Sequence, residues 1–377
     1  MKFFGSIIFL LTSVLPKFKW VILQSYPTFD DNILMIEKYS SQTSITRIIY
    51  LIPLDELPEN KFIFSRKTIF VKRRSAKGVL YYMFSKYVFI THGLYYFKFP
   101  QNQISVNLWH GMPLKKLGVE KGNKGLKTSF TISTSSFFNK SLADAFNIDE
   151  TSIITSNLPR NFKLLDESND LNLKKIFSQG KGKIVVWLPT YRASVEGDIR
   201  IDGKDYGNVV NLPDFDSVQF NEFLKVRDII CYVKPHPMTN YKSTQGLSNF
   251  KIVDDNWLYA RGFTLYDLLS QADMLISDVS SVIVDYLILT RPILFCFSDQ
   301  KEYGNSRGLT SNFLYENLPG ELCGDYNGLL KGIMNFSDNI DQYSNERDLV
   351  AKKFHDINDK SYLYKFLDDL INNKEFK

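Results

Sequence analysis

The sequence has few of the residues that build disulfide frameworks and metal centres. Its 377 residues include only three cysteines, Cys231, Cys296 and Cys323, and four histidines. The cysteines are too few and too scattered for a disulfide framework or a Cys-x-x-Cys zinc site. The glycine pattern of a P-loop is missing too, which argues against a Walker-type kinase. We therefore expect a reduced protein that uses no metal and no cofactor.

Long apolar runs are lacking as well. Hydrophobic residues make up 44% and charged residues 23%, which is typical of soluble globular chains and excludes collagen, coiled coil and disorder. The apolar start, residues 3–15, is shorter than the ~20 residues of a membrane span and has no small-residue cleavage site after it. Residues 1–16 are then either an interfacial helix on the membrane or a helix that caps the first domain. We expect a cytoplasmic protein.

Acidic residues are absent from 60–119, where eleven basic residues occur. Up to residue 142 the chain has twenty basic and seven acidic residues, a balance of +13, and the remainder has 26 and 34, a balance of −8. This asymmetry predicts that the N-terminal half faces a polyanion: nucleic acid, an anionic membrane or a phosphorylated acceptor. A solvated basic surface is the alternative.

Short apolar runs alternate with helical spacing along the chain, which predicts mostly parallel sheets covered by helices. A polar stretch, 164–183, interrupts this pattern and marks a domain boundary. We expect 1–165 and 180–377 to form two doubly wound domains that face a central cleft, with the last helices crossing back. The expected strands are 20–23, 47–52, 68–71, 87–90, 104–108, 130–133, 152–155, 184–188, 229–233, 274–276 and 293–297. The expected helices are 31–39, 76–84, 215–226, 265–271, 280–289, 345–355 and 360–372.

Ligands of such sheets bind beyond the carboxyl ends of the strands, so the segments after the strands carry the candidate site. Two of the four histidines, His110 and His236, follow strands of different predicted domains. Each junction alone has a structural interpretation as a turn, a proline stop or a helix cap. Their combination favours a functional site. The four junctions are 109–116 (Trp-His-Gly-Met-Pro-Leu-Lys-Lys), 189–192 (Pro-Thr-Tyr-Arg), 234–237 (Lys-Pro-His-Pro) and 277–281 (Ser-Asp-Val-Ser-Ser).

These side chains suit phosphoryl chemistry. Ser280 and Ser281, at the start of a predicted helix, offer hydroxyl and N–H groups to a phosphate. Lys234 and Arg192 would add positive charge to a diphosphate without a metal. A histidine near neutrality can accept the proton of an attacking hydroxyl, and a second can support the phosphate that is substituted.

With these motifs the sequence resembles the CDP-glycerol glycerophosphotransferase family of teichoic acid synthesis. The resemblance spans nearly the whole chain, and four motifs in the right order are highly specific. It rests on residues 107–116, 188–192, 234–237 and 268–299, with weaker support from 20–39, 307–308 and 318–320.

The resemblance implies a GT-B fold without a metal, in which the C-terminal domain holds most of the donor nucleotide. It implies transfer of glycerol phosphate from CDP-glycerol to an undecaprenyl-diphosphate-linked acceptor at the cytoplasmic face of the membrane, releasing CMP. His110 would be the general base, His236 would act on the donor phosphate, and Asp285 would contact the glycerol or ribose hydroxyls. The residues implied to bind CDP-glycerol are His110, Gly111, Met112, Pro113, Leu114, Arg160, Pro189, Thr190, Arg192, Lys234, Pro235, His236, Ser280, Ser281 and Asp285.

Three positions depart from the family pattern: Met112 replaces the usual threonine, and Ser156-Asn157 and Tyr26-Pro27-Thr28 replace glycine-containing turns. The identity of the acceptor and of the alditol therefore stays open, with CDP-ribitol as the alternative donor. Two other functional classes are open. One is a GT-B glycosyltransferase that uses a nucleotide sugar, and the other is a module that binds nucleic acid or membranes. The acidic, motif-bearing C-terminal half argues against the module, and we expect no nucleic-acid partner. The chain length favours a primase-like single addition or a compact capsule polymerase.

Overall fold

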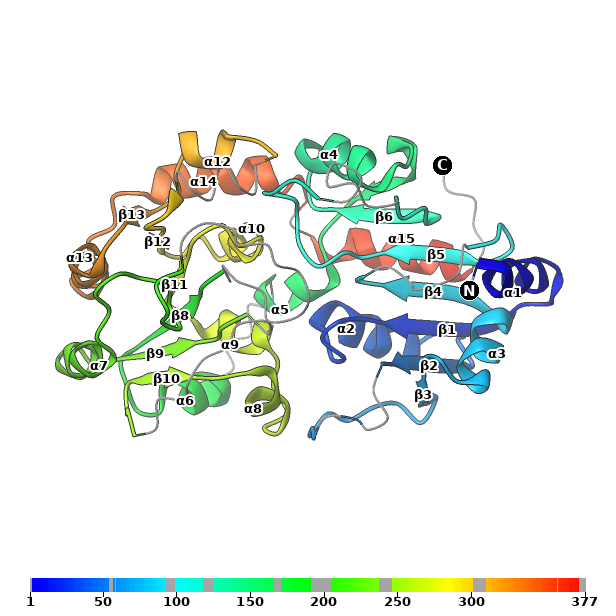
Figure 1. Ribbon diagram of the computed structural model, residues 1–377, viewed down its shortest axis with the longest axis horizontal. Coiled ribbons are helices and arrows are strands. Elements are labelled where there is room, and N and C mark those ends of the chain that lie inside the picture. The colour runs from blue at the N-terminus through cyan, green and yellow to red at the C-terminus, as the bar shows by residue number, and fades with distance from the viewer. Residues whose placement is uncertain are drawn as a thin grey trace.

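The computed structural model describes residues 2–53, 57, 59–92, 99–117, 125–165, 171–190, 205–236, 246–300, 310–357 and 359–372. It contains two β-sheets that stand side by side, each flanked by helices (Figure 1). The strand pairs are parallel, so the predicted class, two doubly wound α/β sheets, is confirmed. The domain limits 1–165 and 180–377 stay a prediction.

The first sheet has seven strands in the order β3-β2-β1-β4-β5-β6-β7. The strand order reverses beside β1, between β1 and β4, which creates the switch point at which such sheets bind ligands. Helices α1 (Lys2–Val14), α2 (Asp31–Ser41), α3 (Ala76–Phe84) and α4 (Ser136–Phe146) accompany it. The strands are β1 (Phe18–Gln24), β2 (Arg47–Ile52), β3 (Thr68–Lys72), β4 (Ser85–Ile90), β5 (Ile104–Asn107), β6 (Phe130–Ser133) and β7 (Ile153–Thr155).

The second sheet has six strands in the order β10-β9-β8-β11-β12-β13, with its own switch point between β8 and β11. The strands are β8 (Lys183–Leu188), β9 (Ile229–Val233), β10 (Phe250–Ile252), β11 (Met274–Ser277), β12 (Ile293–Cys296) and β13 (Glu321–Cys323). The helices are α6 (Leu171–Ser178), α7 (Ser217–Val226), α8 (Asp255–Tyr259), α9 (Leu265–Gln271), α10 (Val282–Tyr286), α12 (Phe313–Glu316) and α13 (Tyr326–Ser337).

The central strands are continuous apolar runs because both faces of each sheet are covered. Side chains alternate between the faces: Val21 and Leu23 lie in one hydrophobic cluster and Ile22 in another. In β8, Ile184 and Val186 belong to the same cluster as Val21, so one hydrophobic core extends across both sheets. This shared core holds the two sheets as one body and fixes where their carboxyl ends meet.

The chain returns to the first sheet at its end. Helices α14 (Ser344–Phe354) and α15 (Lys360–Ile371) follow the second sheet, and Figure 1 shows α15 beside β4 and β5. The Thr134 hydroxyl donates to the Phe354 carbonyl at 2.8 Å. The Tyr87 hydroxyl donates to the Ile371 carbonyl at 3.1 Å. These contacts fasten the C-terminal helices to the N-terminal sheet.

Helix α1 caps the first sheet and presents a second apolar face outward. Ile8 and Thr12 are buried, and Ile8 packs with Ile22 and Val88 of the sheet. Ile7, Leu10, Leu11 and Val14 recur at helical spacing on the exposed side, where Leu10 is 64% and Val14 71% exposed. Among the described residues, none of the helices is both long and apolar enough to cross a membrane.

Several elements lie outside the sequence prediction. Strands β10 and β13 are three residues long, and their half-buried edge positions give little apolar signal. Helices α4 and α13 were not expected, although each begins at a capping residue, Ser135 and Asp325, whose side chain accepts a backbone N–H. Their buried faces carry apolar residues at helical spacing, Phe138, Leu142 and Phe146 in α4 and Leu329, Ile333 and Phe336 in α13, so the signal for both helices is present in the sequence.

The close approach of residue 320 to β12 gives a stability test. A Cβ on Gly320 would lie 2.0 Å from the Ile293 carbonyl oxygen, whereas one on Gly324 would meet its nearest atom at 3.9 Å. We expect Gly320→Ala to lower the free energy of unfolding by about 1–3 kcal/mol, since the backbone of β12 has to shift. The matched variant Gly324→Ala should stay within about 0.5 kcal/mol of the parent. Denaturant unfolding measures both, and equal stabilities would contradict the packing described here.

Candidate active site

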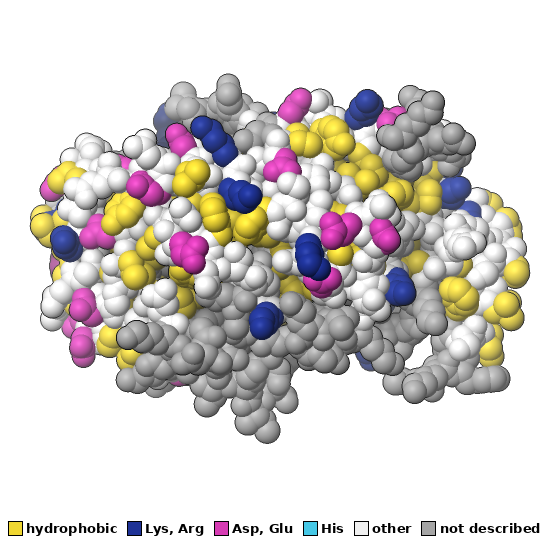
Figure 2. Space-filling view, turned by 90° about the horizontal axis from the view of Figure 1, so that it is seen from above, with side chains coloured by type: hydrophobic (Ala, Val, Ile, Leu, Met, Phe, Trp, Pro, Cys, Tyr) yellow, Lys and Arg dark blue, Asp and Glu magenta, His cyan; other side chains and the backbone are white. Residues whose placement is uncertain are grey.

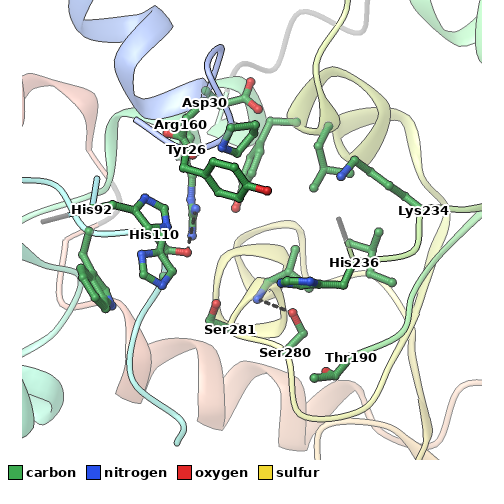
Figure 3. A pocket seen from close by; sticks show the side chains of 18 of the residues that line it. Tyr26, Asp30, His92, His110, Arg160, Thr190, Lys234, His236, Ser280 and Ser281 are labelled. Atoms are coloured by element: carbon green, nitrogen blue, oxygen red, sulfur yellow. Dashed lines mark hydrogen bonds between the residues drawn. The ribbon is translucent and has the colours of Figure 1, made fainter. Parts of the chain in front are cut away.

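A cleft of about 820 Å³ lies where the carboxyl ends of the two sheets meet. Its walls are the segments that follow β1, β4, β5, β8, β9 and β11, as the switch points of the two sheets require. Figure 3 shows His92, His110 and Arg160 on one side and Thr190, Lys234 and His236 on the other.

Most of the predicted site residues line this cleft. Arg192 lies outside the described residues, as do Pro237 and residues 307–308. Asp285 is fully buried beneath the cleft and reaches other protein groups there. The predicted residues that line the cleft are His110, Gly111, Met112, Pro113, Leu114, Arg160, Pro189, Thr190, Lys234, Pro235, His236, Ser280 and Ser281.

The loop after β5 carries His110 into the cleft. It turns sharply there, because Trp109 has a φ of 53° and Gly111 a φ of 141°. A side chain on Gly111 would also collide with the Ser281 hydroxyl, since a Cβ would lie 2.1 Å from Ser281 Oγ. Glycine is therefore required where this loop passes the second sheet. Below the loop, the Met112 sulfur accepts the Thr134 N–H at 3.4 Å.

The tautomer of His110 follows from its partner. His110 Nδ1 lies 3.1 Å from the carbonyl oxygen of Thr91, which can only accept, so Nδ1 carries the hydrogen. Nε2 is then the nitrogen with a free electron pair. His110 is exposed within the cleft, and the walls around it reduce the contact of its ring with bulk water. This desolvation lowers the pKa of His110 well below 6.5, with His92, Arg160 and His236 acting in the same direction.

His236 and Lys234 follow β9 on the opposite wall. Desolvation, with Lys234 and Lys115 nearby, lowers the pKa of His236 to about 4. The Lys234 ammonium is 3.1 Å from a carboxylate oxygen of Asp255 on α8. His110 and His236 are therefore both neutral at pH 7.

Ser280 and Ser281 follow β11 and stand at the start of α10. The Ser280 hydroxyl accepts the Val282 N–H at 3.5 Å, and both serines line the cleft (Figure 3). Nearby, the Thr190 N–H donates to Asp278 at 3.2 Å, which ties the end of β8 to the end of β11. The wall beside His236 thus presents hydroxyl groups and one lysine.

A buried ion pair joins the two sheets below the cleft. Arg160, in the segment after β7, donates to Asp285 of α10 at 2.6 Å and to the His110 carbonyl at 3.2 Å. The Tyr266 hydroxyl of α9 donates to the same oxygen of Asp285, and the guanidinium lies over its ring at 5.0 Å. In this structure one oxygen of the buried Asp285 carboxylate thus accepts from both Arg160 and Tyr266. Its predicted contact with the glycerol or ribose hydroxyls stays a prediction.

Tyr26, Asp30 and His92 are among the residues that line the cleft but were not predicted as site residues. Burial raises the pKa of Asp30 to about 7, although Arg160 opposes the rise. His92 directly follows the junction after β4, so it obeys the same rule as His110 and His236. Its position after a predicted strand was the signal that could have identified it.

A metal centre was not expected. Within the part of the chain that the structure describes, histidine, cysteine and carboxylate side chains do not gather in groups of three or more that could hold a metal ion.

The comparison with known proteins identifies the family. Residues 7–369 match the family described as CDP-glycerol:poly(glycerophosphate) glycerophosphotransferase. The chain belongs to this family. The resemblance seen in the sequence is therefore confirmed, and the cleft is the candidate active site of a CDP-glycerol glycerophosphotransferase family member.

Relatives of this chain are named as enzymes of teichoic acid synthesis. The chain is 28% identical to the teichoic acid glycerol-phosphate primase of Bacillus subtilis (strain 168), over 78% of this chain and 76% of the relative. It is also 28% identical to the teichoic acid poly(glycerol phosphate) polymerase of Staphylococcus epidermidis, over 72% of this chain and 39% of the relative. It thus spans most of the primase and well under half of that polymerase.

Solved structures show the same fold. The wall teichoic acid polymerase TagF superposes with a TM-score of 0.76 at 23% identity, over 98% of this chain and 92% of that chain. A UDP-GlcNAc 2-epimerase from Neisseria meningitidis matches with a TM-score of 0.54 at 10% identity, over 94% of this chain and 99% of that one. The predicted GT-B architecture of this family member is confirmed.

The ion pair of Arg160 and Asp285 gives a test of the site's framework. We expect Arg160→Met to lower the free energy of unfolding by about 3–5 kcal/mol, because the Asp285 carboxylate is left buried and unpaired. Adding Asp285→Leu should recover most of this loss, since the second change removes the uncompensated charge. Denaturant unfolding of the two single variants and the double variant measures the coupling. Losses that simply add would show that the two charges do not depend on each other.

Proposed function

We propose that this protein transfers glycerol phosphate from CDP-glycerol to a hydroxyl of a lipid-linked acceptor in the synthesis of teichoic acid or a related capsule polymer, releasing CMP. Membership of the family supports the reaction class. The observation that carries the proposal is the placement of His110 and His236 on opposite walls of one cleft (Figure 3). We further propose that the acceptor enters from the N-terminal domain, 1–165, and that the C-terminal domain, 180–377, holds the nucleotide.

The second sheet's wall suits the donor diphosphate. The Ser280 and Ser281 hydroxyls can donate to phosphate oxygens, and Lys234 can exchange its contact with Asp255 for a phosphate. Lys115 and Lys116 approach from the loop after β5. A negatively charged diphosphate would find hydrogen-bond donors and cations here without a metal.

His110 is the proposed general base. As the acceptor oxygen attacks the glycerol-linked phosphorus, its proton moves to Nε2, and the bond from phosphorus to the CMP oxygen breaks. The hydrogen bond from Nδ1 to Thr91 orients the ring and stabilises the imidazolium that forms. Because the pKa of His110 is lowered, the ring is in its proton-accepting form well below pH 6.5.

His236 is proposed to act on the departing CMP. A neutral imidazole can donate one hydrogen bond to a phosphate oxygen, and the negative charge of a bound donor favours its protonated form. Arg160 contacts the backbone of His110, so its role is to position the catalytic loop. Asp285 acts through Arg160 in the same way.

Ribitol is a second candidate for the alditol that the donor carries. The relatives include a teichoic acid ribitol-phosphate polymerase, TarL of Staphylococcus aureus, at 24% identity over 66% of this chain and 45% of the relative. Incubation of purified protein with radiolabelled CDP-glycerol, CDP-ribitol or UDP-sugars and a lipid diphosphate acceptor decides among them. Transfer from a UDP-sugar alone would overturn the proposal in favour of a glycosyltransferase.

Replacing His110 and replacing His236 should change turnover and donor affinity differently. We expect His110→Ala to lower turnover by roughly 10²–10⁴-fold with donor affinity largely retained, because only proton removal is lost. His236→Ala should weaken both donor binding and turnover. Measurements of transfer rate, CDP-glycerol affinity and melting temperature on both variants test this.

Folding is the control for this experiment. If both histidines only satisfied the backbone of their turns, the variants would melt at lower temperature and the folded fraction would keep near-normal turnover. A folded His110→Ala protein with the parent's turnover would remove the proposed mechanism.

We also propose that the protein is peripheral and docks on the anionic cytoplasmic face of the membrane. The outward apolar stripe of α1 ends near Phe18, which is 46% exposed, and α3, which packs on α1, carries exposed Lys77 and Leu80. Figure 2 shows hydrophobic side chains gathered at the end of the molecule where α1 lies. Apolar insertion together with nearby cations suits a surface of anionic lipid.

Liposome sedimentation tests the docking proposal. The protein should sediment with anionic liposomes at low salt and less at high salt, since each cation near the surface contributes ~1 kcal/mol that salt screens. Leu10→Gln with Leu11→Gln should weaken sedimentation, whereas Leu349→Gln, on an exposed position of α14, should leave it unchanged. Equal, salt-insensitive binding to neutral liposomes would contradict the electrostatic part.

A further inference from the structure

His92 is the third histidine that lines the cleft, beside His110 and His236. Its ring lies flat against the ring of His110, with a centroid separation of 4.2 Å and an interplanar angle of 9°. Figure 3 shows the two rings together on the same side of the cleft. This contact places two titratable rings face to face, and two protonated imidazoles at this distance would repel each other.

Neighbouring groups hold His92 in this orientation. Its Nδ1 lies 3.0 Å from the Thr91 hydroxyl, while the carbonyl of the same Thr91 accepts from His110. Thr91 is fully buried and therefore links both rings to the end of β4. On the other side, Tyr26 meets the His92 ring edge-on at 5.9 Å. Both the position and the tilt of His92 are thus determined by the protein.

We propose that His92 is a positioning residue for His110: its ring covers one face of the His110 imidazole, excludes water from that face and keeps His110 neutral and aligned for proton removal. This inference rests on the proposed function for its catalytic meaning. The contact itself does not depend on it.

The groups around His110 indicate that the His92 ring acts on the pKa of His110 mainly by excluding water. Desolvation by the surrounding protein is the main cause of the lowered pKa of His110; a charge on His92, Arg160 and His236 also disfavour a proton there, and the Thr91 carbonyl favours one. Burial lowers the pKa of His92 to about 4, so His92 is uncharged across the range in which an ordinary histidine titrates. At neutral pH it therefore acts on His110 by excluding water, and adds charge repulsion only in acid.

Two substitutions of His92 distinguish exclusion of water by its ring from repulsion by its charge. His92→Phe keeps a flat ring over His110 but cannot bind a proton, and His92→Ala exposes the face to water. We expect His110 to titrate near its parent pH in His92→Phe and to move towards the ordinary value in His92→Ala. If the pKa of His110 returns to 6.5, the ratio of turnover at pH 6 to turnover at pH 8 falls by roughly four-fold.

Nuclear magnetic resonance of ¹⁵N-histidine protein measures the titration directly. The His110 signals are identified by their loss in His110→Gln, and each sample is titrated without substrate. The acid limb of the transfer rate is then compared with these midpoints. A role confined to folding would change the melting temperature and the rate without moving the midpoint.

The outcomes are distinct for the two proposals. The inference is overturned if His110 titrates at the same pH in the parent and in His92→Ala, or if His92→Phe moves it as far as His92→Ala does. A midpoint that moves as expected in a protein without transfer activity would support the role of His92 and contradict the proposed function.

Discussion

The buried contact between Arg160 and Asp285 is the constraint on which the site depends. Arg160 comes from the segment after the last strand of the first sheet, and Asp285 from a helix of the second. The same guanidinium binds the carbonyl of His110. A charge left unpaired in the interior costs several kcal/mol, so the sheets cannot separate here unless both groups are rehydrated. This ion pair therefore ties the two sheets together beneath the cleft and fastens the loop that carries His110.

A second polar cluster repeats this arrangement. Lys163 contacts Asp31 of α2 at 2.9 Å and Asp267 of α9 at 2.8 Å, so it too bridges the first and second sheets. Burial raises the pKa of Asp31, and Lys163 opposes that rise. Charges thus hold the interface between the sheets, while the histidines on the cleft walls are left neutral. The buried charges thus fix how the two sheets are placed, and the titratable histidine rings lie in the cleft.

Sequence patterns predicted the buried part of this protein better than its edges. The continuous apolar runs of β1, β8 and β9 exist because helices cover both faces, and the same runs made them visible. The short edge strands β10 and β13 lack that signal. His110 and His236 were found because they follow such runs, and His92 follows one as well. The direction in which Asp285 points could not be predicted, since it depends on Arg160, which lies 125 positions earlier in the sequence.

The charge of the donor explains why a neutral base needs protection. The cleft contains three cations: Arg160 disfavours a proton on His110, and Lys234 and Lys115 disfavour one on His236. A bound diphosphate would offset these cations, so His110 and His236 would both gain proton affinity when the donor binds. That change suits the role proposed for His236 at the departing phosphate. It would disable His110 as the proposed general base, because in that role Nε2 has to stay unprotonated until the acceptor arrives. Cover by an uncharged ring does not weaken when an anion binds, and this is the property that the His92 contact adds to the site.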